Sequence, residues 1–156
     1  MIAQPGLRNI ALLGVLLVLA ACGSGSALQQ SAPDPSPGQR AAVVALEQVG
    51  APYRYGGQSP RGFDCSGLVH YAYSRAGLSV PRTTTQLWSA ARPVPGDDLR
   101  AGDLLFFRID GKMSHVGLYL GEQRFVHAPQ SGRTVAVGSL EAPFYRQALI
   151  RGGRLY

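Results

Sequence analysis

Cysteine is scarce in this chain of 156 residues, and its only two cysteines, Cys22 and Cys65, could form at most one disulfide. Metal ligands are scarce as well. Cys65, His115 and His127 could in principle bind zinc, but no fourth cysteine, histidine or acidic residue stands beside them at ligand spacing. The sequence therefore predicts no metal and no other cofactor.

Other absences exclude further classes of protein. The single tryptophan and the scattered tyrosines offer no platform on which nucleic acid bases could stack. The longest apolar run, residues 10–21, is too short to span a bilayer. No internal repeat is present, and residues 39–156 suffice for one small domain but not for two.

Residues 62–69 predict a loop that turns into a helix with Cys65 in its first turn. Asp64 is a favoured N-cap residue, apolar residues recur at helical spacing as far as Ala76, and Gly77 marks the end. The positive end of a helix dipole stabilises a thiolate, and a nearby imidazole would stabilise it further. This position indicates a nucleophile rather than a core residue.

Two histidines could serve this thiol, and both lie in strand-like runs. His115 and His127 are 12 residues apart (127 − 115), so in a hairpin they share a face only if the loop has an odd number of residues. A three-residue loop over residues 120–122 would set His115 directly opposite His127. We therefore expect a hydrogen bond between the two rings.

Helical patterns occur early in the domain and strand patterns late. We expect helices over residues 40–49, 65–76 and 86–90, and then strands over residues 104–108, 115–120, 124–128 and 134–137, with residues 149–156 as an edge strand. This order predicts an α+β fold in which the Cys65 helix packs on a mainly antiparallel sheet, with the histidines facing the start of that helix.

Six sequence blocks follow one another through the domain. They are residues 52–57 (PYRYGG), 64–69 (DCSGLV), 81–86 (PRTTTQ), 102–107 (GDLLFF), 115–121 (HVGLYLG) and 125–128 (FVHA). Together they resemble the NlpC/P60 family of cell-wall cysteine peptidases. The resemblance implies a papain-like fold that hydrolyses peptide bonds in peptidoglycan stem peptides, with Cys65, His115 and His127 as catalytic residues. It also implies that Tyr53 and the Cys65 N–H stabilise the oxyanion, and that Asp64 and Ser66 line the substrate cleft.

Residues 19–22 (LAAC) close the apolar run and resemble a bacterial lipobox. The resemblance implies a signal peptide over residues 1–21, lipid on Cys22, a flexible tether over residues 22–38 and a catalytic domain over residues 39–156. Gly23 in place of an aspartate favours the periplasmic face of the outer membrane. The alternatives are an ordinary secretory signal and a disulfide between Cys22 and Cys65. If Cys22 is lipidated, Cys65 remains a free thiol.

Several polar residues have ordinary explanations beside functional ones. Asp64 can be an N-cap alone, Ser114 can contact substrate or simply begin a strand, and Arg82 can pair with a substrate carboxylate or lie on the surface. His70 follows Cys65 by about 500° of helical rotation and so points about 140° away from the thiol. We expect His70 to be peripheral.

The net charge of +6, or +5 without Arg8 (6 − 1), suits a carboxylate-rich polymer or anionic headgroups. We therefore expect a monomeric, lipid-anchored peptidoglycan endopeptidase of the cell envelope, with stem peptides and the membrane as its partners and no nucleic acid partner. It would cut the γ-D-glutamyl–diaminopimelate bond or the cross-link between stems. The alternatives are a lipoprotein that only binds the wall or a partner, and a thiol acyltransferase of the same superfamily.

Overall fold

The structure is a computed structural model that describes residues 33–156. The predicted signal peptide (residues 1–21), the predicted lipidation site Cys22 and residues 23–32 of the predicted tether lie outside the described residues. Within residues 33–156, no helix is both long enough and apolar enough to cross a membrane.

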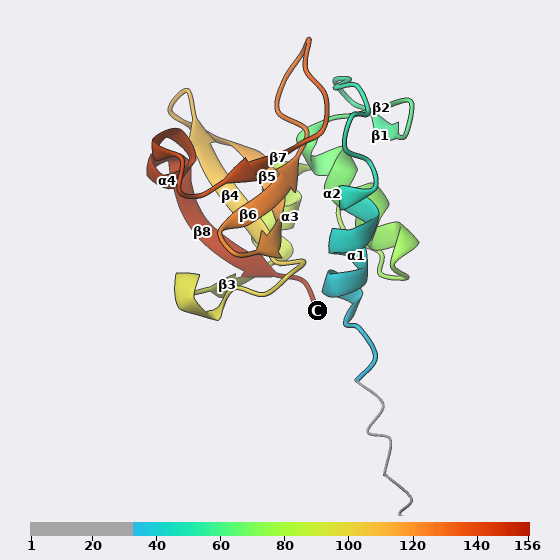
Figure 1. The fold of residues 1–156 in the computed structure, drawn as a ribbon, viewed down its shortest axis with the longest axis vertical. Coiled ribbons are helices and arrows are strands. Elements are labelled where there is room, and N and C mark those ends of the chain that lie inside the picture. Colours follow the sequence, from blue (N-terminus) through green and yellow to red (C-terminus); the bar gives the residue numbers. More distant parts are fainter. Residues whose placement is uncertain (1–32) are drawn as a thin grey trace, which may run out of the picture. The chain divides into compact units, whose positions relative to one another are not determined.

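The first helix, α1 (Pro37–Leu46), begins two residues before the domain boundary predicted at residue 39. Ser36 and Gln39 form a capping box in which each side chain accepts a hydrogen bond from the backbone N–H of the other. The buried face of α1, with Ala41 and Ala45, packs beside α2 (Cys65–Arg75) (Figure 1).

Helix α2 ends as the sequence predicts, with Ala76 as its C-cap and Gly77 in the left-handed region at a φ of 86°. Helix α3 (Thr84–Ala90) starts two residues earlier than expected, because Thr83 and Gln86 form a second capping box. A short fourth helix, α4 (Pro143–Ala148), is not predicted from the sequence. No side chain caps its N-terminus, and Pro143 at its first position is a weaker start signal.

The sheet has six antiparallel strands in the order β3, β8, β4, β5, β6, β7. Their bounds are Arg92–Val94 (β3), Leu104–Ile109 (β4), Lys112–Gly121 (β5), Arg124–His127 (β6), Ala136–Ser139 (β7) and Leu149–Arg154 (β8). A separate pair of two-residue strands, β1 (Gln58–Ser59) and β2 (Gly62–Phe63), precedes α2, and a short 3-10 turn, Gly96–Asp98, follows β3.

The prediction that residues 149–156 form an edge strand is wrong, because β8 pairs with β4 on one side and with β3 on the other. The edge is β3, which was not predicted. Three residues are too few to display an alternating pattern, and a proline in the middle, Pro93, disfavours the prediction of a strand. An edge position tolerates this proline, since its missing N–H is not required by a second neighbour.

The hairpin of β5 and β6 has a different register from the one predicted. Its loop consists of two residues, Glu122 and Gln123, with φ values of 51° and 58°, and β5 is irregular between Tyr119 and Gly121. Leu118 pairs with Val126. Extending this register sets His127 across from Gly117, so His115 and His127 are diagonal neighbours rather than direct partners. The shorter loop and the irregularity compensate, and both rings still share one face.

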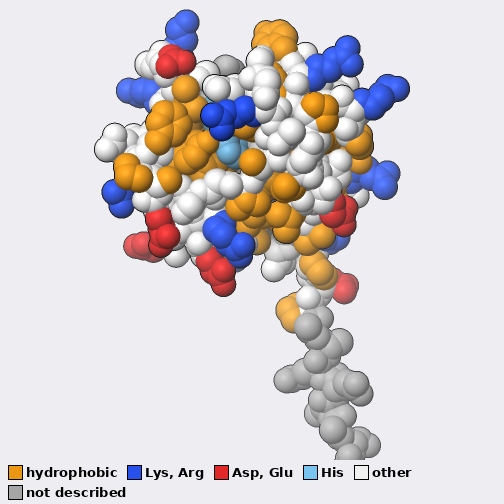
Figure 2. Space-filling view, turned by 45° about the horizontal axis from the view of Figure 1, so that its top comes forward, with side chains coloured by type: hydrophobic (Ala, Val, Ile, Leu, Met, Phe, Trp, Pro, Cys, Tyr) orange, Lys and Arg blue, Asp and Glu red, His pale blue; other side chains and the backbone are white. Residues whose placement is uncertain are grey.

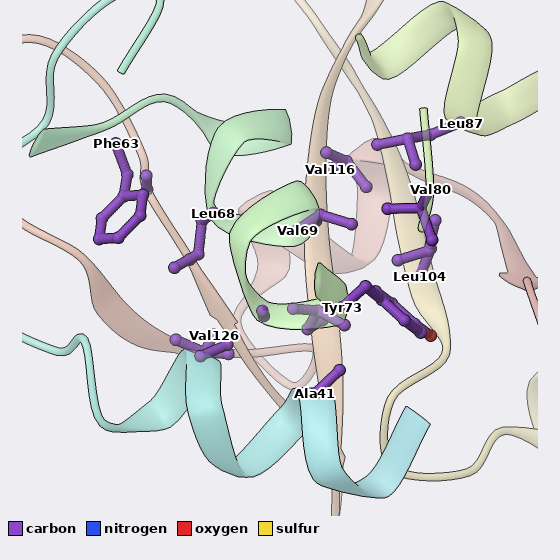
Figure 3. Close-up of a cluster of buried hydrophobic side chains, with 14 of the residues drawn as sticks. Ala41, Phe63, Leu68, Val69, Tyr73, Val80, Leu87, Leu104, Val116 and Val126 are labelled. Carbon is purple, nitrogen blue, oxygen red and sulfur yellow. The ribbon is translucent and has the colours of Figure 1, made fainter. Parts of the chain in front are cut away.

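The core forms where α2 packs on the sheet (Figure 3). Leu68, Val69 and Tyr73 of α2 are at most 1% exposed and belong to one apolar cluster with Val116 of β5 and Val126 of β6. The buried Tyr73 hydroxyl donates a hydrogen bond to the carbonyl oxygen of Gly102 at 2.7 Å. This packing holds the first turn of α2 against the middle of the sheet.

A buried ion pair ties the C-terminal strand to the start of β4. Arg154 donates two hydrogen bonds of 2.6 Å to Asp103, which is completely buried and also accepts one from the Arg100 N–H. The side chain of Arg154 is only 9% exposed, so water cannot replace the carboxylate as its partner. Removing Asp103 would therefore leave a buried guanidinium without its counterion.

We expect Asp103→Ala to lower the free energy of unfolding by about 3 to 5 kcal/mol, the usual cost of breaking one side of a buried pair. Urea denaturation followed by circular dichroism measures this change. The matched control is Glu122→Ala, which breaks the exposed pair with Arg124 and should cost less than about 1 kcal/mol. Equal losses in the two variants would contradict the structural role of the buried pair.

Candidate active site

Cys65 is the first residue of α2, and the loop before it holds the helix start in place. The Asp64 side chain caps the helix by accepting a hydrogen bond from the Gly67 N–H at 2.6 Å, and it accepts another from the Gly56 N–H at 2.9 Å. A Cβ on Gly67 would collide with the carbonyl oxygen of Gly57, so a glycine is required at this close approach. The thiol therefore sits at the positive end of an anchored helix.

The sulfur of Cys65 faces α3 and β5. Its Sγ atom lies 3.7 Å from the Thr84 hydroxyl and 3.8 Å from the carbonyl oxygen of Ser114. The backbone of Val116 also acts on the thiol as a hydrogen-bonding group. The thiol thus contacts the backbone on both sides of His115, and within the described residues it is free of any disulfide.

The two predicted histidines are in contact and buried. Nε2 of His115 lies 2.8 Å from Nδ1 of His127, and the two side chains are 4% and 3% exposed. The diagonal reach from β6 to β5 passes over Gly117, where a Cβ would come within 3.4 Å of the His127 Cβ and 2.8 Å of the Phe125 ring. This contact uses Nε2 of His115 and leaves Nδ1 of His115 outside the contact between the two rings.

Burial governs the ionisation of these three residues. It raises the pKa of the Cys65 thiol, and the hydrogen bonds with Thr84 and the Val116 backbone offset only part of this effect. Burial lowers the pKa of His115 to about 3, with a further contribution from His127, and it lowers the pKa of His127 to about 4. At neutral pH these shifts favour a neutral thiol and neutral imidazoles over the thiolate that the helix dipole and a nearby imidazole would favour.

The thiol opens into a groove of about 500 Å³, which we call the thiol groove. Its lining includes all four predicted substrate-binding residues, the thiol itself and the predicted oxyanion residue: Tyr53, Asp64, Cys65, Ser66, Arg82 and Ser114. Burial raises the pKa of Tyr53, with smaller contributions from Cys65 and Asp64, so its hydroxyl keeps its proton at neutral pH. The structure therefore brings these six residues to one open surface, whereas His115 and His127 do not line it.

Arg82, Asp64 and Ser66 are bonded to one another. Arg82 donates to both carboxylate oxygens of Asp64 at 3.0 and 2.9 Å, to the Ser66 hydroxyl at 3.0 Å and to the carbonyl oxygen of Gly57 at 3.2 Å. The positive charge of Arg82 is thus balanced inside the protein. Asp64 acts as an N-cap and as the partner of Arg82 at the same time.

Two further polar residues have local partners. The Ser114 hydroxyl donates to the carbonyl oxygens of Ile109 and Lys112 at 3.4 and 3.3 Å, so it stabilises the turn between β4 and β5. His70 has its Nδ1 atom 2.9 Å from the carbonyl oxygen of Val80, and it lines neither the thiol groove nor the hollow beside His127. This location agrees with the peripheral position predicted for His70.

Tyr145 on α4 is a site residue that the sequence does not reveal. Its hydroxyl oxygen lies 3.4 Å from Nε2 of His127, and the two rings meet edge to face with their centres 5.3 Å apart. Phe107 and Phe125 of the sheet pack against the same tyrosine. The row of contacts thus runs from His115 through His127 to Tyr145, which lies 18 residues after His127 in the sequence.

A second hollow, of about 300 Å³, lies beside the two histidines and is called the histidine hollow here. Its polar lining consists of His115, His127, Gln130, Arg133 and Tyr145. Figure 2 shows a face of the molecule on which a histidine side chain lies in a depression beside a basic side chain. Within residues 33–156, no group of three or more histidine, cysteine or acidic residues is placed to hold a metal ion.

We expect Cys65 to react slowly with iodoacetamide at neutral pH, and the rate to rise with pH beyond the ordinary thiol range, because only the thiolate reacts and burial raises its pKa. The His115→Ala variant should react at nearly the wild-type rate near neutral pH, since a neutral imidazole does not stabilise the thiolate by charge. Mass spectrometry of the alkylated protein gives both rates. A wild-type rate that has already reached its plateau in mildly acidic buffer would contradict the neutral resting state.

Comparisons with known proteins agree with this architecture. Residues 50–154 match the model of the NlpC/P60 family. The murein DD-endopeptidase MepH of Escherichia coli strain K12 is 39% identical over 127 residues, which cover 75% of this chain and 47% of MepH. The gamma-D-glutamyl-L-lysine dipeptidyl-peptidase of Bacillus subtilis strain 168 is 39% identical over 104 residues, which cover 65% of this chain and 35% of that protein. The chain therefore spans about half or less of these two relatives.

The crystal structure of the NlpC/p60 domain of the peptidoglycan hydrolase SagA is similar with a TM-score of 0.65 and 35% identity, covering 75% of this chain and 97% of that domain. The predicted α+β architecture, with the Cys65 helix packed on an antiparallel sheet, is confirmed. Since the family model matches about two thirds of the sequence, including the segments that carry Cys65, His115 and His127, the chain belongs to the NlpC/P60 family.

Proposed function

We propose that this chain is a peptidoglycan endopeptidase that cleaves stem-peptide bonds through a Cys-His-His thiol mechanism. The observation that carries the proposal is a helix-start thiol at an open groove, with its sulfur 3.8 Å from the carbonyl oxygen of Ser114. The next residue, His115, has its ring in contact with that of His127. The relatives that share this domain are named as an endopeptidase, a dipeptidyl-peptidase and a peptidoglycan hydrolase.

Cys65 is the proposed nucleophile, and the helix start supplies part of the oxyanion site. The N–H groups of the first turn of a helix have no partner within the helix, so the Cys65 N–H can donate to an oxyanion formed next to the sulfur. Tyr53 lines the same groove and keeps its proton at neutral pH, so its hydroxyl provides a second donor. One such donor is typically worth about 3 kcal/mol in the transition state.

His115 is the proposed general base, and the neighbouring rings define its tautomer. If Nδ1 of His115 accepts the thiol proton, Nε2 of His115 carries a hydrogen and donates it to Nδ1 of His127. His127 then carries its own hydrogen on Nε2, which faces the Tyr145 oxygen. Tyr145 is thus a positioning residue, because accepting this hydrogen keeps Nδ1 of His127 free to receive the one from His115.

The reaction then runs in two balanced steps. The thiol proton passes to His115 as the sulfur bonds to the scissile carbonyl carbon, and His115 returns that proton to the leaving amine as the carbon–nitrogen bond breaks. A water molecule next gives a proton to His115 and its oxygen to the thioester carbon. The carbon–sulfur bond then breaks, which releases the acid, and His115 returns the proton to the sulfur. Because burial keeps His115 neutral, its Nδ1 lone pair is free to accept a proton at neutral pH.

We further propose that Cys22 carries the lipid anchor, which would hold the enzyme at the periplasmic face of the outer membrane. The apolar run over residues 10–21 and the sequence LAAC at residues 19–22 support this proposal. We expect Cys22→Ser to lose incorporation of a palmitate analogue and to leave the membrane fraction of the producing cells. A variant that still fractionates with membranes, as the wild type does, would contradict a lipid anchor at Cys22.

Digestion of purified peptidoglycan tests the activity directly. We expect the wild-type enzyme to release muropeptides, which mass spectrometry assigns either to the cross-link or to the γ-D-glutamyl–diaminopimelate bond. Cys65→Ala should abolish this release because Cys65 carries the only thiol within residues 33–156. Undiminished cleavage by Cys65→Ala would refute the thiol mechanism, and products of N-acyl transfer alone would identify an acyltransferase instead.

The same assay compares the contributions of His115, His127 and Tyr145 to turnover. His115→Ala should remove turnover, whereas His127→Ala should reduce it less, and Tyr145→Phe should lower kcat by about tenfold or less while leaving KM unchanged. The phenylalanine retains the packing against His127 and removes only the hydroxyl oxygen. A loss in His127→Ala as large as that in His115→Ala would mean that the two roles are assigned wrongly.

A further inference from the structure

The two hollows beside the reacting groups differ in what they can receive. Cys65 and the proposed oxyanion donors line the thiol groove, whereas His115 and His127 line the histidine hollow, and the two hollows share no lining residue. The scissile carbonyl must lie over the sulfur, and the leaving amine must reach His115 to be protonated. The part of the substrate that leaves with the amine is therefore directed toward the histidine hollow.

The two hollows also differ in their electrostatics. The thiol groove contains Arg82, but Asp64 already neutralises its charge through a pair of hydrogen bonds. The histidine hollow is lined by Arg133 and by no acidic residue. Within residues 33–156 the exposed side chain of Arg133 makes no ion pair. Its positive charge is thus available to a ligand.

The backbone of Arg133 is held in place even though its side chain is exposed. Its carbonyl oxygen accepts a hydrogen bond of 2.8 Å from the Tyr53 N–H, and its own N–H donates to the carbonyl oxygen of Gln130 at 3.2 Å. The next residue, Thr134, forms a β-bridge with Pro52. The guanidinium is close enough to Tyr145 to influence the ionisation of its hydroxyl. The side chain of Arg133 therefore extends from a fixed backbone position beside the histidine pair.

We propose that the histidine hollow binds a free carboxylate on the leaving-group side of the scissile bond, with the Arg133 guanidinium as its partner and the Gln130 amide beside it. A guanidinium pairs with a carboxylate through two parallel hydrogen bonds, which makes it selective for this group. The inference rests on the proposed function. Both candidate bonds release an amine of diaminopimelate, which carries an amino group and a carboxyl group at each end. The ligand class is thus the carboxylate of diaminopimelate.

The experiment uses two stem-peptide substrates that differ only in whether the free carboxylate of diaminopimelate is a carboxylate or a carboxamide. We expect the wild-type enzyme to prefer the carboxylate by about tenfold or more in kcat/KM, mainly through KM, as a charged hydrogen bond would provide. Arg133→Gln should bring this ratio close to one, because it should lower kcat/KM for the carboxylate substrate alone.

The control variant is Arg146→Gln, which removes the same charge from an exposed arginine of α4 that lines neither hollow. It should retain the wild-type preference, and this separates a local contact from the general effect of net charge. A preference that survives in Arg133→Gln, or that is lost equally in Arg146→Gln, would overturn the proposal. Thermal unfolding of both variants establishes that each is folded.

A second measurement makes failure of this inference distinguishable from failure of the proposed function. The two peptides are titrated calorimetrically onto the Cys65→Ala variant, with and without Arg133→Gln, so that binding is observed without turnover. We expect about tenfold tighter binding of the carboxylate peptide, and loss of that difference with Arg133→Gln. Equal binding of both peptides overturns the inference even if the wild type hydrolyses them. Hydrolysis of neither peptide by the wild type, with selective binding intact, refutes the endopeptidase function alone.

Discussion

The packing of α2 against the sheet is the constraint on which the active site depends. Leu68 and Val69 are almost completely buried against a cluster that includes Val116, the residue after His115. The same helix begins with Cys65, so the contact that forms the core also sets the thiol against the strand that carries His115. A displacement of α2 by one turn, about 5.4 Å, would separate the two without breaking a single covalent bond.

The chemistry of the site follows from the apolar surroundings of its polar groups. Phe107 and Phe125 lie beside the two histidines, with ring centres 5.9 Å from His115 and 5.0 Å from His127 respectively, and both phenylalanines are completely buried. Such surroundings disfavour charge, so the imidazoles remain neutral. A buried ring nitrogen without a hydrogen bond also costs free energy in these surroundings. The contact between the rings, extended to Tyr145, supplies such hydrogen bonds and orients the base at the same time.

The two arginines near the site illustrate how a residue type takes its role from its neighbours. Arg82 is enclosed by Asp64, Ser66 and the carbonyl oxygen of Gly57, and it stabilises the loop that presents the thiol. Arg133 stands on a fixed backbone with its side chain open to solvent. The sequence motif draws attention to Arg82, whereas only the three-dimensional arrangement draws attention to Arg133.

Local chemistry in the sequence determines much of this protein: the start of α2 at Cys65 and its end before Gly77, the buried strands around His115 and His127, and the α+β order of its elements. These features depend on capping residues and on periodic burial, which neighbouring residues encode. The interior place of β8, the diagonal contact of the histidines and the arrival of Tyr145 are decided only in the tertiary structure. Each depends on pairing between segments that are distant in the chain or on an irregularity in a strand, and no local pattern specifies which partner such a segment will meet.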